Sequence, residues 1–337
     1  MKIFMIGATG LLGSAGANEL IKRGHEVHSI SLPPIPQDSN INPEIKLSLG
    51  NYLELSDDEL REHLRGCEGF VFAAGIDERV ELPPPCYDGY VKYNIEPVKR
   101  ILKIAQEEGV KKSVILGSYF AYFAKEYPEL KLYEKNPYIR SRIDQENAAF
   151  SYSNNGMDVM VLELPYIFGV QKGRKPVWTI ILKQILSMKN ATIYPSGGTT
   201  MVTVQQVAQC IAGAIENGKG NTAYPVGYYN MTWREFLKVV HNSIGMPNRR
   251  IITIPKFVYK MFAGKLVKEY KEKNIEPGLD PYSLGDLMSM NLFINKDIIQ
   301  NELGVTEDDI EKEIGESFKM SLKILNGKED AIGMKAE

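Results

Sequence analysis

The chain has 337 residues, of which 44% are hydrophobic and 24% are charged, a composition typical of a globular protein and not of a disordered or collagen-like one. At about 150 residues per domain, this length predicts roughly two domains or one large α/β unit. Lysine and arginine number 40 and aspartate and glutamate 42, which gives a net charge of −2. Such a balance creates no strong field for a polyanion, so we do not expect nucleic acid as a partner.

Cysteine and histidine patterns exclude two further classes. Cys67, Cys86 and Cys210 are far apart, and neither C-x-x-C nor H-E-x-x-H occurs, so we expect no disulfide framework and no metal site. Three free thiols fit a reducing, cytoplasmic environment. No apolar run approaches the roughly 18 residues that span a bilayer, so a membrane partner is not expected.

The N-terminal half alternates short apolar runs with helical patterns. Residues 2–6 predict a buried strand, 11–23 a helix that ends at Gly24, and 26–32 a second strand, which together form a βαβ unit. The same alternation continues with helices expected over 57–65, 91–108 and 138–153, and strands expected over 69–74, 112–117 and 158–164. Repeated βα units predict an α/β fold with a Rossmann-like, doubly wound parallel sheet.

The pattern loosens after Gly169, where proline, glycine and lysine cluster, while residues 203–217 again predict a helix. We therefore divide the chain into a dinucleotide-binding domain and a smaller C-terminal α/β lobe for the substrate. The domain is expected over residues 1–169 with 199–228 returning to it, the lobe over 170–198 and 229–325, and a disordered tail over 326–337.

Three glycines, Gly7, Gly10 and Gly13, stand between the first strand and the first helix. A tight strand-to-helix turn requires residues without Cβ, and so does close approach of the backbone to a pyrophosphate. The helix N-terminus behind the turn offers free N–H groups and the positive end of a dipole. This spacing directly after the first strand predicts a dinucleotide site.

The segment GATGLLG at 7–13 resembles the extended short-chain dehydrogenase/reductase superfamily, in its NAD-dependent epimerase/dehydratase group. Further matches over residues 1–245 lie at 66–75, at Asn94, at 165–169, at 204–208 and at 232–235. The resemblance implies a nicotinamide cofactor and a homodimer through the helices near 91–108 and 138–153. With the turn, it assigns the cofactor to Gly7, Thr9, Gly10, Leu11, Leu12, Gly13, Ser31, Asn51, Tyr52, Ala73, Ala74, Gly75, Asn94, Pro165 and Ile167.

The choice between NAD and NADP depends on the end of the second strand. An acid there binds the ribose 2′-hydroxyl of NAD, and an arginine accommodates the 2′-phosphate of NADP. Here Ser31 and Leu32 take those places, and no lysine or arginine occurs between Arg23 and Lys46. Both cofactors stay open, and the lack of a lysine or arginine favours NAD.

The reacting groups implied by the resemblance are Ser118, Tyr138 and Arg142. Ser118 follows the strand at 112–117, and Tyr138 and Arg142 occupy the tyrosine and lysine places of the family's Y-x-x-x-K motif. Spaced i and i+4, they lie on the same face of a helix. Arginine keeps the charge that lowers a phenol's pKa, but it cannot relay a proton. The literal Y-x-x-x-K, Tyr127 to Lys131, contains Pro128, and we interpret it as a surface loop.

These motifs predict hydride transfer to or from a sugar-like or small carbonyl or hydroxyl substrate. The alternative is a nucleotide-binding sensor or scaffold with little turnover, because of Arg142. Two arginines that nucleotide-sugar enzymes of this group use are replaced by Thr199 and Glu163, and nearby basic residues at 172–175 or 249–250 could substitute or be solvated loop charges. Residues 256–273 carry six lysines among apolar residues. They predict a surface helix with its apolar side on the core, or one that touches an anionic ligand or membrane.

Overall fold

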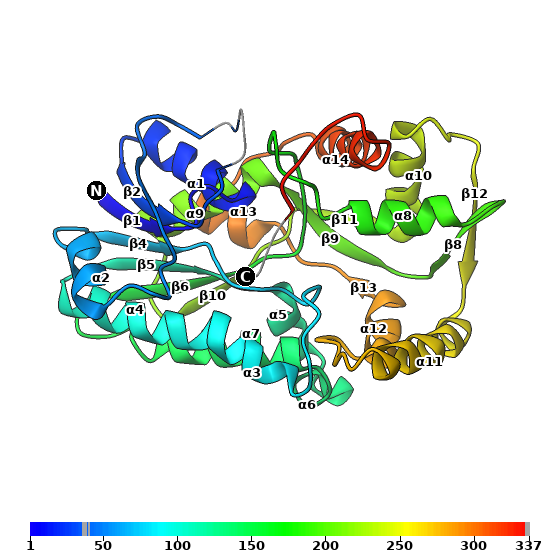
Figure 1. Ribbon diagram of the computed structural model, residues 1–337, viewed down its shortest axis with the longest axis horizontal. Helices are drawn as coiled ribbons and strands as arrows, with labels where there is room; N and C mark the ends of the chain where they lie inside the picture. Colours follow the sequence, from blue (N-terminus) through cyan, green and yellow to red (C-terminus); the bar gives the residue numbers. More distant parts are fainter. Residues whose placement is uncertain (36–38, 40, 334–337) are drawn as a thin grey trace.

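The structure, a computed structural model, describes residues 1–35, 39 and 41–333. Two bodies of secondary structure lie side by side, a large sheet with helices on both faces and a smaller lobe (Figure 1). The large body contains β1 (Lys2–Ile6), α1 (Leu11–Lys22), β2 (Glu26–Ser31), β3 (Lys46–Leu49), α2 (Asp57–Leu64), β4 (Gly69–Phe72), α3 (Cys86–Tyr90), the π-helix η1 (Val91–Ile95), α4 (Glu96–Glu107), β5 (Lys112–Leu116), α5 (Tyr119–Glu126), the 3-10 helix η2 (Pro128–Leu130), α6 (Leu132–Lys135), α7 (Pro137–Phe150), β6 (Asp158–Glu163), α9 (Val204–Asn217), β10 (Thr222–Pro225) and α13 (Asp297–Leu303).

The large sheet confirms the predicted Rossmann-like fold. Its seven strands run in the order β10-β6-β5-β4-β1-β2-β3, and every neighbouring pair is parallel. The direction of winding reverses between β1 and β4, which opens a crevice at the carboxyl ends of these two strands. The glycine turn follows β1 and therefore lies in that crevice.

Helices cover both faces of this sheet because its central strands are apolar throughout. Met5 and Phe4 of β1 are fully buried and point to opposite faces, as the two-residue period of a strand requires. α1, α9 and α13 pack together on one face, and α2, α4 and α7 pack on the other (Figure 1). Gly16 lets α1 approach α9 closely, since a Cβ there would lie 2.7 Å from Cδ1 of Ile211.

The smaller lobe is built around a short sheet and an aromatic core. β9 is central, with β11 and β13 beside it and β7 also paired to it, while β12 pairs with β8. Trp178 stacks on Phe168 with ring centres 4.2 Å apart. The lobe contains β7 (Tyr166–Phe168), α8 (Thr179–Ser187), β8 (Ala191–Pro195), β9 (Gly198–Thr203), β11 (Tyr229–Thr232), α10 (Trp233–Ser243), β12 (Arg250–Ile254), α11 (Lys256–Glu272), α12 (Pro281–Met288), β13 (Asn291–Leu292) and α14 (Ile310–Leu325).

Several elements differ from the sequence prediction. Residues 199–203 do not return to the large sheet; they form β9 of the lobe, and the return is made by α9 and β10. The helix expected over 91–108 continues from α3 and contains the π-helical turn η1. β3 and α5 were not expected, because neither carries a clear periodic pattern.

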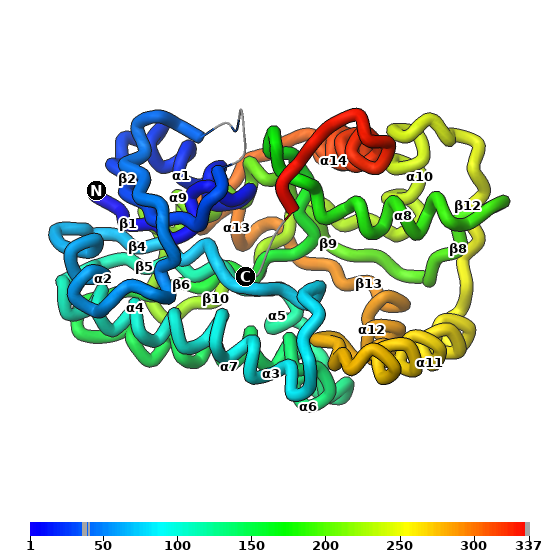
Figure 2. The backbone as a smooth tube through the Cα atoms, in the orientation of Figure 1, coloured from blue at the N-terminus to red at the C-terminus, as the bar shows by residue number. Residues whose placement is uncertain are grey.

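The predicted tail over 326–337 is only partly within the described residues, which end at 333. From α14 the chain runs back toward the middle of the molecule (Figure 2). Ile332 there donates its N–H to the carbonyl of Gly173 and accepts from the N–H of Lys175. At Ile332 the structure therefore differs from the expected free tail, because the backbone pairs with a loop.

Within the described part of the chain, no helix is long and apolar enough to cross a membrane. The same residues contain no group of three or more His, Cys, Asp or Glu side chains arranged to hold a metal ion.

Candidate active site

In the glycine turn, backbone atoms approach one another too closely to leave room for side chains. Gly7 has φ +93°, and a Cβ there would lie 2.5 Å from the carbonyl oxygen of Ala73. A Cβ on Gly13 would lie 2.1 Å from the carbonyl oxygen of Gly7. Gly10 donates its N–H to the same Gly7 carbonyl at 3.0 Å. The turn therefore has this shape only because these positions lack side chains.

The N-terminus of α1 is open behind the turn. Gly10 is its N-cap, and no side chain caps the helix. The N–H groups of Leu11, Leu12 and Gly13 are the ones that an α-helix cannot satisfy internally. A cradle without Cβ atoms and a helix end with free donors together fit the diphosphate of a dinucleotide.

The hydroxyls of Ser31 and Ser29 accept hydrogen bonds from the backbone of this turn. The Ser31 hydroxyl accepts the N–H of Thr9 at 3.3 Å, and the Ser29 hydroxyl accepts the N–H of Ala8 at 3.3 Å. Both serines lie on one face of β2 and are buried. Ser31 was assigned to the cofactor from sequence, and its contacts here are with the turn itself.

Arg174 also contacts the glycine turn. From sequence, the basic residues at 172–175 were considered for a different role, and this contact was not predicted. Nη2 of Arg174 donates to the carbonyl of Thr9 at 3.1 Å and its Nε to Gln171 at 3.0 Å. Gln171 also donates to the Thr9 carbonyl, at 3.1 Å. Among the described residues no carboxylate forms an ion pair with Arg174, and burial lowers the pKa of its guanidinium. A cation beside the positive end of α1 is electrostatically unfavourable unless an anion joins it.

Asn51 and Tyr52, both assigned to the cofactor from sequence, make local contacts in the fold. The Asn51 side chain accepts the N–H of Leu53 and donates to Glu54 at 2.9 Å. Tyr52 is buried edge-on against Phe72 with ring centres 5.8 Å apart. These contacts leave Asn51 as a turn residue at the rim of the crevice.

The loop after β4 is held by Asn94. Its side chain accepts the N–H of Ile76 at 2.8 Å and donates to the Ile76 carbonyl at 2.9 Å. Gly75 has φ +113°, and a Cβ there would lie 2.5 Å from Oδ1 of Asn94. Ala73 and Ala74 precede this clamp and keep the carboxyl end of β4 small and partly open. Asn94 therefore holds the loop after β4 in place, and its assignment to the cofactor stays a prediction.

Pro165 and Ile167 lie on the segment that leaves β6. Ile167 belongs to β7, and its carbonyl accepts the indole N–H of Trp178 at 3.0 Å. Pro165 stands between β6 and β7. The pair therefore lies where the large sheet passes into the lobe.

Tyr138 stands at the start of α7 and is 4% exposed. Its N–H donates to the carbonyl of Gly278 at 2.9 Å, and its ring packs edge-on against Tyr90 and Phe120. Burial raises the pKa of Tyr138, while the charge of Arg142 lowers it. Its hydroxyl is therefore a neutral phenol near neutral pH, with a cation available to stabilise the phenolate.

Arg142 lies one turn further along α7, over the face of the Tyr138 ring. Its Nη1 donates to Gln145 at 3.0 Å and its Nη2 to the carbonyl of Ile76 at 3.0 Å. The Gln145 side chain in turn donates to the Asn94 carbonyl at 2.7 Å. The buried Nε of Arg142 has no partner among the described residues. The structure therefore brings Tyr138 and Arg142 together and fixes the guanidinium in one orientation.

Ser118 is the N-cap of α5. Its hydroxyl accepts the N–H of Phe120 at 3.4 Å, and it contributes a small lowering of the pKa of Tyr138 as a hydrogen-bond partner. Tyr127 and Lys131, the literal Y-x-x-x-K, do not share an α-helix. η2 lies between them, and Lys131 has φ +52°.

A buried acid pair lies behind α5. Lys125 contacts Glu146 at 2.7 Å and Glu163 at 2.9 Å. Burial raises the pKa of Glu163 to about 7, although the Lys125 charge lowers it. Glu163 and Thr199 occupy the places of the family's two arginines, and Thr199 is buried and donates to the Tyr119 hydroxyl at 3.2 Å.

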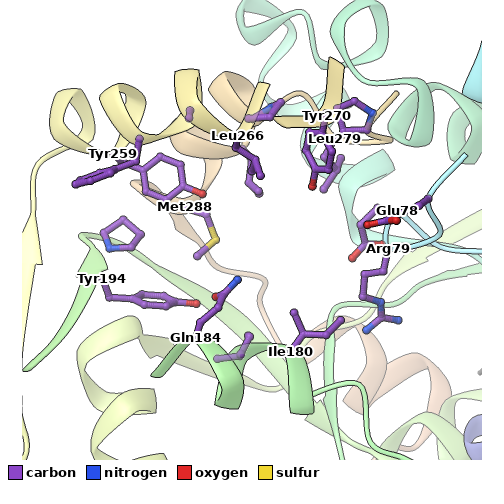
Figure 3. A pocket seen from close by; sticks show the side chains of 18 of the residues that line it. Glu78, Arg79, Ile180, Gln184, Tyr194, Tyr259, Leu266, Tyr270, Leu279 and Met288 are labelled. Carbon is purple, nitrogen blue, oxygen red and sulfur yellow. The ribbon is translucent and has the colours of Figure 1, made fainter. Parts of the chain in front are cut away.

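A cavity of about 730 Å³ separates the loop after β4 from the lobe (Figure 3). Glu78 and Arg79 stand on one side, α8 contributes Ile180 and Gln184, and α11 and α12 close the opposite wall. Phe120, which packs against Tyr138, also lines it. The cavity therefore reaches Phe120, whose ring contacts that of Tyr138, while Tyr138 itself does not line it.

α11 corrects the expectation of a helix with its apolar side on the core. Ala263 is its one buried residue, whereas Phe257, Met261 and Phe262 are 64% to 74% exposed. Phe262 lines the cavity. The helix packs against α12, and Phe257 and Met261 belong neither to a buried core nor to the lining of the cavity.

The parallel sheet and the glycine turn define a Rossmann-fold protein. The chain belongs to the NAD dependent epimerase/dehydratase family, whose family model matches residues 3–227. Among curated proteins, none matches the sequence.

Solved structures share the fold over almost the whole chain. The protein gox2253 is 20% identical, with 97% of this chain and 99% of that chain covered and a TM-score of 0.73. A nucleoside-diphosphate-sugar epimerase from Pseudomonas aeruginosa is 15% identical, with 98% and 99% covered and a TM-score of 0.68. A UDP-glucuronic acid 4-epimerase from Bacillus cereus, in complex with NAD, is 12% identical, with 96% and 99% covered and a TM-score of 0.66. At these identities the likeness is one of fold.

Proposed function

We propose that the protein is an NAD-dependent oxidoreductase of the epimerase/dehydratase type, which acts at a carbon that carries a hydroxyl or carbonyl group. The observation that carries this proposal is the placement of Tyr138 and Arg142 on one face of α7, with Arg142 bonded to the Ile76 carbonyl in the loop that follows β4. Family membership supports the cofactor and the general reaction class.

The cofactor's diphosphate would be held by the Gly7–Gly13 turn, the N-terminus of α1 and Arg174. NAD is favoured because β2 ends in Ser31 without a neighbouring arginine, and because a structure of similar fold is a complex with NAD. When bound, the nicotinamide ring accepts or returns a hydride, which is chemistry that no protein side chain supplies.

The chain's own part is to hold and move one proton. Tyr138 would donate its phenolic proton to the substrate oxygen during reduction and remove it during oxidation. Ser118 would orient the substrate oxygen. Arg142 would stabilise the phenolate by its charge, without itself relaying a proton.

The test is turnover of NAD or NADH by the purified protein and by Tyr138→Phe, with coenzyme affinity measured separately by calorimetry. We expect Tyr138→Phe to lose on the order of 10²- to 10⁴-fold in rate and to retain coenzyme affinity. Equal rates for the two proteins would contradict the role of Tyr138.

One observation favours a second candidate, a coenzyme-binding sensor or scaffold. Nη1 of Arg142 donates to Gln145 and Nη2 to the carbonyl of Ile76, so the guanidinium is held by the protein's own groups and lacks the freedom of a lysine ammonium to follow a ribose hydroxyl. In this case the wild-type protein binds NAD without turnover, and Arg142→Lys creates turnover. A homodimer through α4 and α7 stays a prediction of the family resemblance.

A further inference from the structure

We propose that the cavity beside Tyr138 accepts an uncharged, ring-containing alcohol or ketone, and that it excludes nucleoside diphosphates and other phosphorylated substrates. This inference rests on the proposed function, since it names the substrate class of the same site.

The cavity borders two parts of the chain that contact Tyr138. Phe120 lines it, and its ring centre lies 6.4 Å from that of Tyr138. Gly278, which accepts the Tyr138 N–H, is flanked by the lining residues Pro277 and Leu279. A ligand in the cavity would therefore lie one side chain, that of Phe120, away from the proposed acid and base.

The charges of the lining disfavour a phosphate. Glu78, Glu81 and Glu276 are its acidic residues, and Arg79 is its one basic residue. Arg79 is already engaged by the carboxylate of Asp77, to which its Nε donates at 3.0 Å. Free arginine or lysine side chains are the charge-assisted donors by which a binding site most strongly holds a phosphate. The carboxylates would instead repel it.

Two of the basic residues that could have replaced the family's arginines, Arg249 and Arg174, bind other groups. Arg249 donates to Thr192 and to the carbonyl of Ile185 at the end of α8, both at 2.9 Å. Arg174 lies at the glycine turn. Neither of them lines the cavity, so neither would hold a diphosphate there.

The remaining walls are apolar and aromatic. Ile180 on α8 lies across the space from Leu266 on α11, and the rings of Tyr194 and Tyr259 line one side of it (Figure 3). Ile180 is 47% and Leu266 37% exposed. An apolar ring system would cover these side chains and gain from their removal from water. The volume of about 730 Å³ lies within the range of about 300–1,000 Å³ that is typical of small-molecule sites. It suits a ligand of two or three rings.

The test is calorimetric titration of the NAD-loaded protein with two ring ketones, decalone and phenylcyclohexanone, and with UDP-glucose. We expect saturable binding of at least one ketone and none of UDP-glucose. Ile180→Arg, which places a charge in the apolar wall, should weaken ketone binding about tenfold or more. Leu186→Arg is the matched control, because Leu186 lies on the same helix, is 37% exposed and does not line the cavity.

Saturable binding of UDP-glucose, failure of both ketones to bind, or equal effects of the two arginine variants would each overturn the inference. NAD titration of the same preparation separates this from failure of the proposed function. If NAD binds and UDP-glucose also binds, the substrate class is wrong while the oxidoreductase proposal stands. If NAD does not bind but the free protein takes a ketone and Ile180→Arg weakens that binding, the cavity inference stands and the proposed function fails.

Discussion

The guanidinium carbon of Arg142 lies 5.1 Å from the centre of the Tyr138 ring. The family's motif has a lysine at this place, and a lysine ammonium is carried by a flexible side chain. The Arg142 guanidinium instead donates a hydrogen bond to the Ile76 carbonyl in the loop after β4. The positive charge is thus fixed beside the phenol, and this has a consequence for the pH dependence of the reaction.

We expect alcohol oxidation to accelerate as pH rises toward the pKa of Tyr138. Burial raises that pKa and Arg142 lowers it, and oxidation requires the phenolate, whose fraction grows with pH. Arg142→Gln removes the lowering charge, so its rate profile should shift to higher pH, while Arg142→Lys should keep the wild-type profile. Stopped-flow rates of hydride transfer across pH measure this. An unchanged profile in Arg142→Gln would show that the charge does not act on Tyr138.

Arg174→Gln should weaken NAD binding by about 10- to 100-fold, because a hydrogen bond to a charged group contributes about 1.5–3 kcal/mol. Lys175→Gln removes the same charge from the next residue of the loop and serves as the control. Calorimetric titration with NAD measures both, and the same Kd for the two variants would place Arg174 outside the coenzyme site.

Gly13→Ala should abolish NAD binding and destabilise the fold, because its Cβ would lie 2.1 Å from the Gly7 carbonyl oxygen. Gly50→Ala is the matched control, since a Cβ there meets its nearest neighbour, Cδ1 of Ile30, at an ordinary 3.5 Å. Thermal unfolding with and without NAD tests the pair. A Gly13→Ala protein that NAD still stabilises would contradict the proposed cradle.

Glu163 should make the protein less stable as pH rises from about 4.5 to 7. Burial raises the pKa of this carboxyl from 4.5 to about 7, so in that window the folded chain binds more protons than the unfolded one. The shift corresponds to about 3 kcal/mol, and Glu163→Gln should gain up to this free energy of unfolding at pH 8 and little at pH 4.5. Urea unfolding at both pH values measures it. Glu129→Gln, an exposed site, should change neither value.

The sheet was predictable from sequence because its central strands are short apolar runs separated by helical periodicity. β1 was predicted with its correct bounds, and the order of strands follows from repeated right-handed βα crossovers. β3 was missed because its residues are mostly exposed, so no burial pattern distinguishes Lys46–Leu49 from a loop.

The site was only partly predictable. The glycine turn and the α7 pair depend on local spacing, which sequence shows directly. The contact of Arg174 with Thr9 joins residues 165 positions apart, and no local pattern reports such a distance. The sequence offered one signal for this contact, which is that Arg174 follows Gly173 in a loop with no other assigned role. Likewise, the exposed apolar side of α11 repeats at helical spacing, and that spacing alone does not show whether a core or a cavity lies opposite.

The pairing of Ile332 with the loop at Gly173 and Lys175 has a consequence for biosynthesis. A ribosome completes the seven parallel strands once residue 225 has emerged, yet the loop that carries Arg174 gains its backbone support only after residue 332. Chains that include β10 but stop before Ile332 should therefore form the sheet and leave the loop that carries Arg174 poorly ordered. A bulky fusion directly after Ile332 should disturb the same loop, although the two are far apart in sequence.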